Sequence, residues 1–341
     1  MQSTKFTKAV LAVALAGAFA APAMAQSSVT VGGLFDTYVG SMQNADNAKS
    51  KVVVNSGGMT TSYIGFSGVE DLGSGLKAKF VLNAFLQGDT GAAGRFPGDT
   101  LFSRDANLTL SGGFGEVQVG RGLAPNFLPT ILFNPFGDSF AFSPLVLRTL
   151  TSTINGDTGW SNQIKYTTPS IGGLTVNLHY QLGEVVGNTS KNNVGINALY
   201  FNGPLSLTAY YHEVEVKNPG GALDTSRQKA SFVGGAYDFG LAKLFATYDE
   251  TKNNAAVISQ DKSDTTSIGV SVPVGAGKVL AGYAVTNRTI GTASEVKSET
   301  ATVGYDYFIS KRTDLYSMLM SNKVTKFDDG TSFGVGIRHR F

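Results

Sequence analysis

The feature that most constrains the fold of this chain is an alternation of apolar and polar residues with a period of two. Segment 174–181 reads LTVNLHYQ, and segments 76–83 and 205–212 alternate in the same way. Successive side chains of a β-strand point to opposite faces, so each segment predicts a strand with one apolar and one wet side.

Sixteen such segments are expected, at 28–41, 59–69, 75–87, 100–111, 114–121, 158–169, 172–184, 191–202, 204–215, 226–238, 241–252, 264–273, 276–287, 297–308, 311–322 and 331–341. Some connections are tight turns rich in Gly, Asn, Asp and Pro, at 70–75, 111–115, 169–173, 202–204, 238–240 and 273–277. Longer polar connections lie at 42–58, 88–99, 122–157, 216–225 and 253–263. Short and long connections in alternation are typical of the hairpins of one closed sheet.

Two all-β folds have strands of this kind, a water-soluble sandwich and a transmembrane barrel. Sandwich strands are about 5 to 6 residues long and carry plentiful charge on their outer faces. Here the strands are nearer to about ten residues, and aromatic residues recur near their ends. Charged residues make up 15% of the chain, against about 25% in typical soluble proteins. These features favour an all-β transmembrane barrel with a polar lumen.

The first 25 residues have the pattern of a cleaved secretory signal. Lys5 and Lys8 precede an apolar run over 9–20, and Ala23 and Ala25 form a cleavage site of small residues. That run is shorter than the roughly 20 residues that a membrane-spanning helix needs. Residues 26–341 are then expected to form a single barrel domain, although length alone, at roughly 150 residues per domain, suggests two.

The charge of the expected mature chain excludes some partners. Loss of two lysines lowers the 27 basic residues to 25, which equals the number of acidic residues. A neutral chain gives no support to nucleic-acid binding. We therefore expect no nucleic acid among the partners.

Residues that carry catalysis or bind metals are sparse. The chain has no cysteine, which excludes disulfides, a CxxC redox centre and thiolate metal sites. Its three histidines, His179, His212 and His339, occur singly, and there is no HExxH, GxSxG or P-loop motif. We expect neither enzymatic activity nor a cofactor or metal.

The last segment strengthens the barrel prediction. Phe333, Val335 and Ile337 share one face, whereas Arg338 and Arg340 share the other. The last strand of a barrel pairs with the first, so that no strand edge is left in lipid.

Several motifs resemble those of the trimeric general porins of Gram-negative bacteria, especially the neisserial and burkholderial type. The stretch 64–78, IGFSGVEDLGSGLKA, is similar to a strand, turn and strand motif of that family. Shorter matches follow in the family's order, at 101–104, 110–115, 119–121, 135–137, 165–166, 310–316 and 336–341. Each match is weak alone, but their order and the strand count are specific.

The resemblance implies a sixteen-stranded antiparallel barrel in the outer membrane, assembled as a homotrimer among outer-membrane lipid and lipopolysaccharide. It implies passive diffusion of small hydrophilic solutes and ions through a water-filled channel. The third external loop would fold into the lumen as a constriction, and 122–157 is the third long connection. A structureless loop of this length is uncommon unless it is functional.

The resemblance also implies that acidic residues of the inward loop face arginines of the wall. Asp138 fits the loop acid, with a turn residue beside Gly137 as the alternative, and Arg104 fits a wall arginine. Arg148 would either meet Asp138 or reinforce the wall. Opposed charges in a confined lumen bias ions and orient dipolar solutes.

The chain departs from the family at two wall positions that are commonly arginine, here Tyr63 and Gly159. Alternation places Tyr63 inward, opposite in phase to Ile64, and gives Trp160 the lipid-facing phase of Ile164. Further basic residues could line the pore or lie solvated at a rim: Lys77, Lys79, Lys165, Arg121, Arg338 and Arg340. We expect weaker anion preference than in relatives with all the arginines, and a more aromatic constriction.

Two other outer-membrane functions stay open. A solute-specific channel with an aromatic constriction is the nearer alternative, because of Tyr63. A structural or adhesive protein with a plugged lumen would have larger or repetitive loops, whereas only 122–157 is long here.

Overall fold

The computed structural model describes residues 28–45, 49–150, 158–184, 186, 192–217, 225–254 and 261–341, so the expected signal segment 1–25 lies outside the described residues. The strands are β1 (Ser28–Met42), β2 (Lys51–Ser56), β3 (Tyr63–Gly73), β4 (Leu76–Phe85), β5 (Asp105–Gly112), β6 (Gly115–Leu123), β7 (Gly159–Thr167), β8 (Leu174–Gln181), β9 (Asn193–Asn202), β10 (Leu205–Lys217), β11 (Thr225–Asp238), β12 (Lys243–Asn254), β13 (Asp261–Val274), β14 (Gly277–Ile290), β15 (Val296–Phe308), β16 (Thr313–Val324) and β17 (Gly330–Arg340). The helices are α2 (Phe127–Leu132) and α3 (Pro144–Thr149). In the described part of the chain, no helix is long and apolar enough to cross a membrane.

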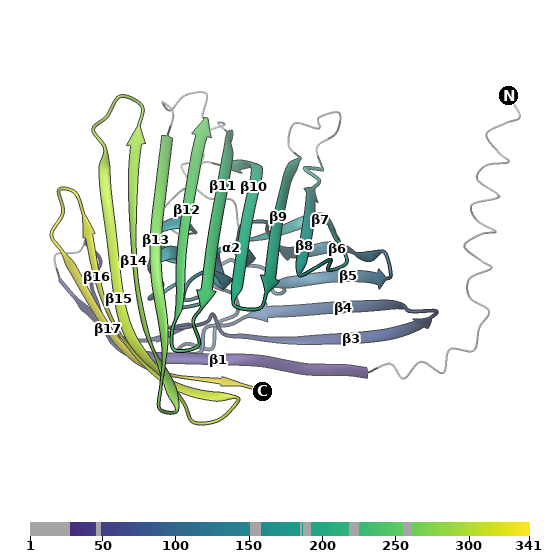
Figure 1. Cartoon of the computed structure of the whole chain (residues 1–341), viewed down its shortest axis with the longest axis horizontal. Coiled ribbons are helices and arrows are strands. Elements are labelled where there is room, and N and C mark those ends of the chain that lie inside the picture. Colours follow the sequence, from purple (N-terminus) through teal and green to yellow (C-terminus); the bar gives the residue numbers. More distant parts are fainter. Residues whose placement is uncertain are drawn as a thin grey trace, which may run out of the picture.

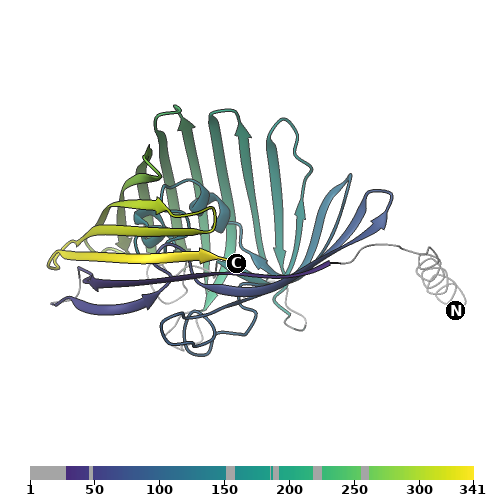
Figure 2. The same cartoon turned by 90° about the horizontal axis from the view of Figure 1, so that it is seen from below.

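The antiparallel sheet closes on itself through its first and last strands. β1 pairs with β17 over eight residue pairs, from Leu34 with Arg340 to Ser41 with Phe333. Gly33 and Phe341 extend this seam by exchanging two backbone hydrogen bonds of 3.1 Å. Figure 2 shows β17, in yellow, alongside β1, in purple. Because the seam leaves no unpaired edge, the sheet can stand in lipid.

The second strand of the barrel is split into β2 and β3. β2 pairs with the C-terminal part of β1, and β3 pairs with its N-terminal part. The seventeen described strands therefore form a sixteen-stranded barrel, as predicted. The prediction of a polar connection over 42–58 is wrong at β2, because the consecutive valines 52–54 show no alternation that would indicate a strand.

Burial alternates along the strands as the sequence pattern predicts. In β17, Phe333, Val335 and Ile337 are exposed on the outer face, whereas Gly334 and Arg338 are buried on the inner face. From β9 to β14 the tight turns gather at one rim, and the longer connection 291–295 leaves β14 at the other (Figure 1). The barrel therefore has a short-turn rim and a long-loop rim.

A bulge in β7 reverses the expected orientation of Trp160. The register between β6 and β7 shifts next to Asn162, whose φ angle is +52°. The extra residue changes the phase, so Trp160 is 3% exposed and packs against Ala124 and Val214, whereas Ile164 is 43% exposed. The prediction that Trp160 faces lipid is wrong, because alternation holds only along an uninterrupted strand.

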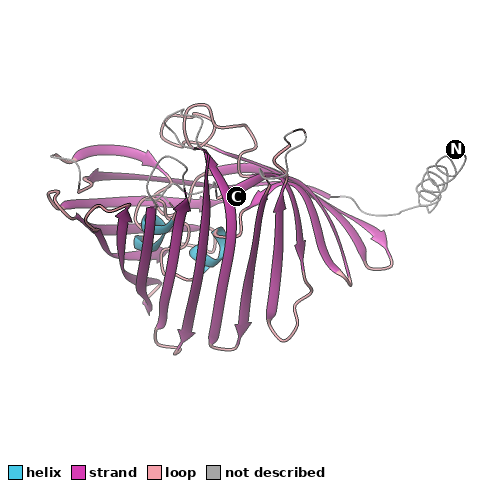
Figure 3. Ribbon diagram, turned by 90° about the horizontal axis from the view of Figure 1, so that it is seen from above, coloured by secondary structure: helices cyan, strands magenta, loops and turns pink. Residues whose placement is uncertain are grey.

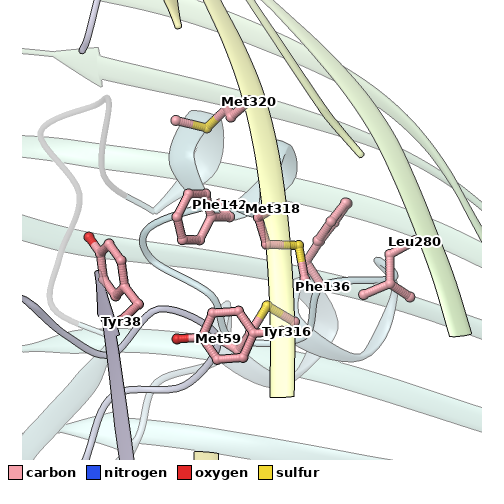
Figure 4. Packing of buried hydrophobic residues seen from close by; sticks show 8 residues of the cluster. All are labelled: Tyr38, Met59, Phe136, Phe142, Leu280, Tyr316, Met318 and Met320. Atoms are coloured by element: carbon pink, nitrogen blue, oxygen red, sulfur yellow. The ribbon is translucent and has the colours of Figure 1, made fainter. Parts of the chain in front are cut away.

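The connection between β6 and β7, here called the inward loop, lies inside the barrel. Figure 3 shows its two helices, in cyan, enclosed by strands. Phe136 and Phe142 of this loop belong to a buried cluster with wall residues Tyr38, Met59, Leu280, Tyr316, Met318 and Met320 (Figure 4). The predicted inward third loop is therefore confirmed, and its residues 151–157 lie outside the described part.

Candidate functional site

Glycines of the wall make room for the inward loop. At Gly269 of β13 an added Cβ would lie 2.5 Å from Pro135 Cδ, and at Gly334 of β17 it would lie 2.6 Å from Phe142 Cζ. Real Cβ atoms essentially never come within 3.0 Å of another heavy atom in this way. The rings of the loop thus occupy space that only glycine leaves free.

Further apolar contacts hold the loop against the wall formed by β9–β12. Phe133 packs against Leu199 of β9 and Phe245 of β12. Leu145 of α3 packs against Tyr210 of β10. The loop therefore covers the inner face of these strands.

A cavity of about 730 Å³ lies between the inward loop and the wall made by β1, β2 and the end of β4. Asp138 and Phe140 line it from the loop. Lys51, Arg95 and Arg104 line it from the wall and the connection between β4 and β5. The structure thus brings Asp138 and Arg104 to one cavity.

Arg104 lies against aromatic rings. Its guanidinium carbon is 4.1 Å from the centre of the Tyr63 ring and 5.5 Å from that of Phe85. Its Nε is 3.7 Å from the Asp105 carboxylate. A cation over a ring face is attracted by the ring quadrupole. Tyr63, at one expected arginine position, therefore helps to orient the arginine that is present.

Asp138 is bonded to a residue of segment 57–62. The Thr60 hydroxyl donates to Asp138 Oδ1 at 2.9 Å and accepts from Arg338 Nη1 at 2.9 Å. Burial raises the pKa of the Asp138 carboxyl, and the Thr60 hydrogen bond and the charges of Arg104 and Arg338 act in the opposite direction. Asp138 follows a turn glycine, Gly137, with a φ angle of +60°, and also bonds to Thr60, 78 positions away in the chain.

Arg338 lies between two carboxylates. Its Nε is 2.9 Å from Asp314 Oδ2, and its Nη2 is 3.4 Å from Asp306 Oδ2. Arg340 Nη1 is 3.0 Å from the other oxygen of Asp314. Arg338 is buried, whereas the Arg340 side chain is 43% exposed. Arg340 therefore presents more of its charge to solvent than Arg338 does.

Asp36 of β1 holds segment 57–62 inside the barrel. Its carboxylate oxygens accept backbone hydrogen bonds from Gly58, Met59 and Thr60, at 3.1, 2.8 and 2.8 Å, and the Tyr316 hydroxyl also donates to it. Sequence reasoning missed both Asp36 and Thr60. The available signal was that Asp36 is the one charged residue of β1.

Arg148 reaches the wall rather than Asp138. Its Nε donates to Thr300 Oγ1 of β15 at 2.8 Å, and its Nη2 donates to Asn322 Oδ1 of β16 at 2.9 Å. Burial lowers its pKa to about 10, so it is still charged at neutral pH. Of the two roles expected for it, the contacts correspond to reinforcement of the wall.

The other basic residues expected to line the pore are spread over β4, β6 and β7. Lys77 and Lys79 are exposed, and Lys165 is half-buried. Arg121 Nη1 donates to the Gly159 carbonyl oxygen at 3.1 Å, so its charge lies beside the second expected arginine position. Within the described residues, none of the four lines the cavity that holds Asp138.

The cavity combines opposed charges with apolar walls. Among the described residues, no cluster of three His, Asp or Glu side chains could hold a metal ion. The arrangement can select solutes by size and charge as they pass.

Comparison with known proteins agrees with this geometry. Residues 11–326 match the Gram-negative porin family. Outer membrane porin protein 32 of Delftia acidovorans is 34% identical over 251 residues, which cover 72% of this chain and 69% of that protein. The structure of the anion-selective porin from Comamonas acidovorans has a TM-score of 0.79 at 29% identity and covers 93% of this chain and all of its own.

A more distant structure shares the fold alone. The trimer form of OmpT from Vibrio cholerae has a TM-score of 0.72 at 17% identity, over 92% of this chain and 99% of its own. The sequence, the fold and the lining of the lumen thus all support a channel of the porin type. This chain belongs to the Gram-negative porin family and is an outer-membrane channel protein.

Proposed function

We propose that the channel passes small hydrophilic solutes and ions by diffusion and selects them weakly in favour of anions. The observation that carries this proposal is the cavity that Asp138 shares with Lys51, Arg95 and Arg104. Arg95 is paired with Asp99 at 2.9 Å, so the excess of free positive charge is small. The anion-selective Comamonas porin supports the same sign.

Planar-bilayer recordings of the refolded mature protein test this proposal. We expect an open channel whose current follows the salt concentration, and a reversal potential in a salt gradient that indicates a weak anion preference. A protein that forms a heat-labile trimer yet never opens contradicts the channel proposal. A strong cation preference contradicts only the proposed preference for anions and leaves the channel proposal intact.

A solute-specific channel is the second candidate, because apolar side chains share the cavity with the charges. Phe85, Phe127, Phe140, Leu150 and Met320 all line it. Such a lining could bind an amphipathic solute with an aromatic ring during passage. Current block by benzoate but not by acetate at equal concentration favours this candidate, whereas equal effects of both contradict it.

We propose that the chain is exported with removal of residues 1–25 and assembles as a homotrimer. Membership of the porin family supports both, and OmpT of Vibrio cholerae has been described in a trimer form. Mass spectrometry of the purified protein tests the cleavage site after Ala25. A band of three chains that dissociates on heating tests the trimer. We also propose that the protein has no enzymatic activity and no nucleic-acid partner.

We propose that lipopolysaccharide binds the outside of the barrel near the long-loop rim. Lys229, Lys252 and Lys262 lie side by side on β11, β12 and β13, with side chains about half exposed. Like charges in cross-strand contact are unfavourable alone, although Glu213 and Glu250 pair with these lysines. A phosphorylated glycolipid would relieve the remaining repulsion.

Replacing the three lysines by glutamine tests this partner. We expect the variant to retain less purified lipopolysaccharide at low salt, because surface charge interactions are screened by salt. The matched control replaces Lys77 and Lys79, which lie on another strand. Equal retention by both variants contradicts the proposal.

A further inference from the structure

Segment 57–62, which separates β2 from β3, turns inward and is tied down at both ends. Gly57 N donates to the Asp36 carbonyl oxygen at 2.8 Å, and Ser62 Oγ bonds to both the N–H and the carbonyl oxygen of Asp36. The Asp36 carboxylate holds the middle of the segment. This break in the strand is therefore a fixed part of the barrel, in keeping with the placement of strand irregularities next to functional sites.

The segment contacts the inward loop at two adjacent residues. Thr60 Oγ1 donates to Asp138 Oδ1 at 2.9 Å, and Ser139 Oγ donates to the Gly58 carbonyl oxygen at 2.5 Å. Ser139 is completely buried, and Thr60 is buried as well. Both bonds join segment 57–62 to the inward loop, between residues that are about 80 positions apart in the chain.

The Thr60 hydroxyl also links two charged groups. It accepts a hydrogen bond from Arg338 Nη1 while it donates to Asp138. A hydroxyl can do both at once, since it has one donor and two acceptor positions. Arg338 is in turn held by Asp314 and Asp306. The result is a continuous path from the wall carboxylates to the acid of the loop.

We propose that segment 57–62 is a latch for the inward loop and that Thr60 is its positioning residue, which keeps Asp138 and the tip of the loop in place through its hydroxyl. This inference rests on the proposed channel function. Without the hydroxyl, the buried Arg338 loses an acceptor and the half-buried Asp138 loses a donor. Unpaired buried polar groups are unfavourable, so the tip leaves the latch more often.

Substitution of Thr60 tests the latch. Thr60→Val keeps the shape of the side chain and removes the hydroxyl, whereas Thr60→Ser keeps the hydroxyl and removes the methyl group. The matched control is Thr61→Val, in the same segment, whose hydroxyl has no hydrogen bond within the described part of the chain. We expect Thr60→Val to raise the frequency of transient closures roughly tenfold, equal to about 1.4 kcal/mol, and Thr60→Ser and Thr61→Val to behave as wild type.

A second readout does not depend on conductance. The chain has no cysteine, so Ala141→Cys in the inward loop introduces a single thiol that is half-buried. Its labelling rate reports how often the loop opens locally. We expect Thr60→Val to raise that rate by a similar factor. If Thr60→Val does not insert, Asp138→Ala removes the same bond from the side of the loop and is expected to have the same effect.

Some outcomes overturn the latch. If Thr60→Val changes neither the closure frequency nor the labelling rate, the bond between Thr60 and Asp138 does not hold the loop. If Thr60→Val does not insert, an unchanged labelling rate in Asp138→Ala leads to the same conclusion. An equal change in Thr60→Ser, which keeps the hydroxyl, assigns the effect to the packing of the Thr60 side chain and not to its hydrogen bonds. A wild-type protein that never conducts contradicts the channel function instead, and the labelling rates then still decide the latch.

Discussion

Single side chains decide which charges a passing solute meets in this channel. Arg104 stacks on Tyr63, and Asp138 is bonded to Thr60, so both charges are oriented by uncharged partners. Arg338 is enclosed by Asp306 and Asp314, which compensate much of its charge. The field in the cavity therefore depends on more than the number of charged residues.

Tyr63→Arg is expected to shift the selectivity of the channel toward anions. Two charges at about 4 Å interact by about 1 kcal/mol even in bulk water, which corresponds to roughly a fivefold change in a permeability ratio. The reversal potential in a salt gradient measures the shift, and Tyr63→Phe, which keeps the ring, is the control. A reversal potential that does not move means that Tyr63 is not at the constriction.

The Asp138 carboxyl is expected to make the selectivity depend on pH. Burial raises its pKa above the ordinary value of 3.8, although Thr60, Arg104 and Arg338 act in the opposite direction. As the pH falls through the raised pKa, the acid becomes neutral while Arg104 stays charged, so anion preference increases. Reversal potentials recorded from neutral to acidic pH show this step, and Asp138→Asn is expected to lack it.

The same shift has a consequence for stability. Because the folded chain favours the neutral carboxyl, its contribution to the free energy of unfolding is fully present below the ordinary pKa and is lost as the pH rises through the raised pKa. The selectivity prediction is contradicted if the wild-type channel and Asp138→Asn have the same pH profile, because Asp138 then does not cause the pH dependence.

Among the elements, the inward loop depends on glycines of the strands that it touches. Gly269→Val is expected to displace the loop, because the new side chain needs the space that Pro135 occupies. Overpacking of this kind costs roughly 1 to 3 kcal/mol. Gly235→Val is the matched control, since a Cβ there lies 3.5 Å from Leu207, an ordinary contact. Thermal dissociation and the spread of single-channel conductances measure the effect. Equal behaviour of the two variants would show that the inward loop does not depend on the space left by Gly269.

Elements could be predicted from the sequence wherever alternation is uninterrupted. All sixteen expected strand segments have a counterpart. The prediction fails at β2, at the bulge that turns Trp160 inward, and at 59–62 and 100–104, which lie outside the strands. Motif resemblance brought Asp138 and Arg104 to the site, and the structure places both in one cavity. For Asp36 the only signal was its place as the one charged residue of β1. Thr60 could not be predicted, because its partner Asp138 lies 78 positions away in the sequence.

For the whole molecule, one closed sheet provides both the channel and the seat of its constriction. The first strand pairs on one side with the last strand and on the other with both halves of the second. Asp36, on the inner face of this seam strand, holds the segment that carries Thr60. Closure of the barrel therefore brings the Arg338 side chain of β17 to Thr60 and positions the constriction.

Closure in this register can be tested by a disulfide across the seam, since the chain has no cysteine of its own. Val39 of β1 lies opposite Val335 of β17, and both are exposed on the outer face. Residues opposed in this way have Cα atoms about 5.5 Å apart, within the range of a disulfide. We expect Val39→Cys with Val335→Cys to oxidise to a cross-linked barrel that resists unfolding in detergent. In the control, Ile337→Cys replaces Val335→Cys and moves the partner two residues, roughly 7 Å, along β17. The two Cα atoms are then roughly 7 to 9 Å apart, which is too far for a disulfide. Cross-linking of the control pair, or of neither pair, contradicts the register on which the contact between Arg338 and Thr60 depends.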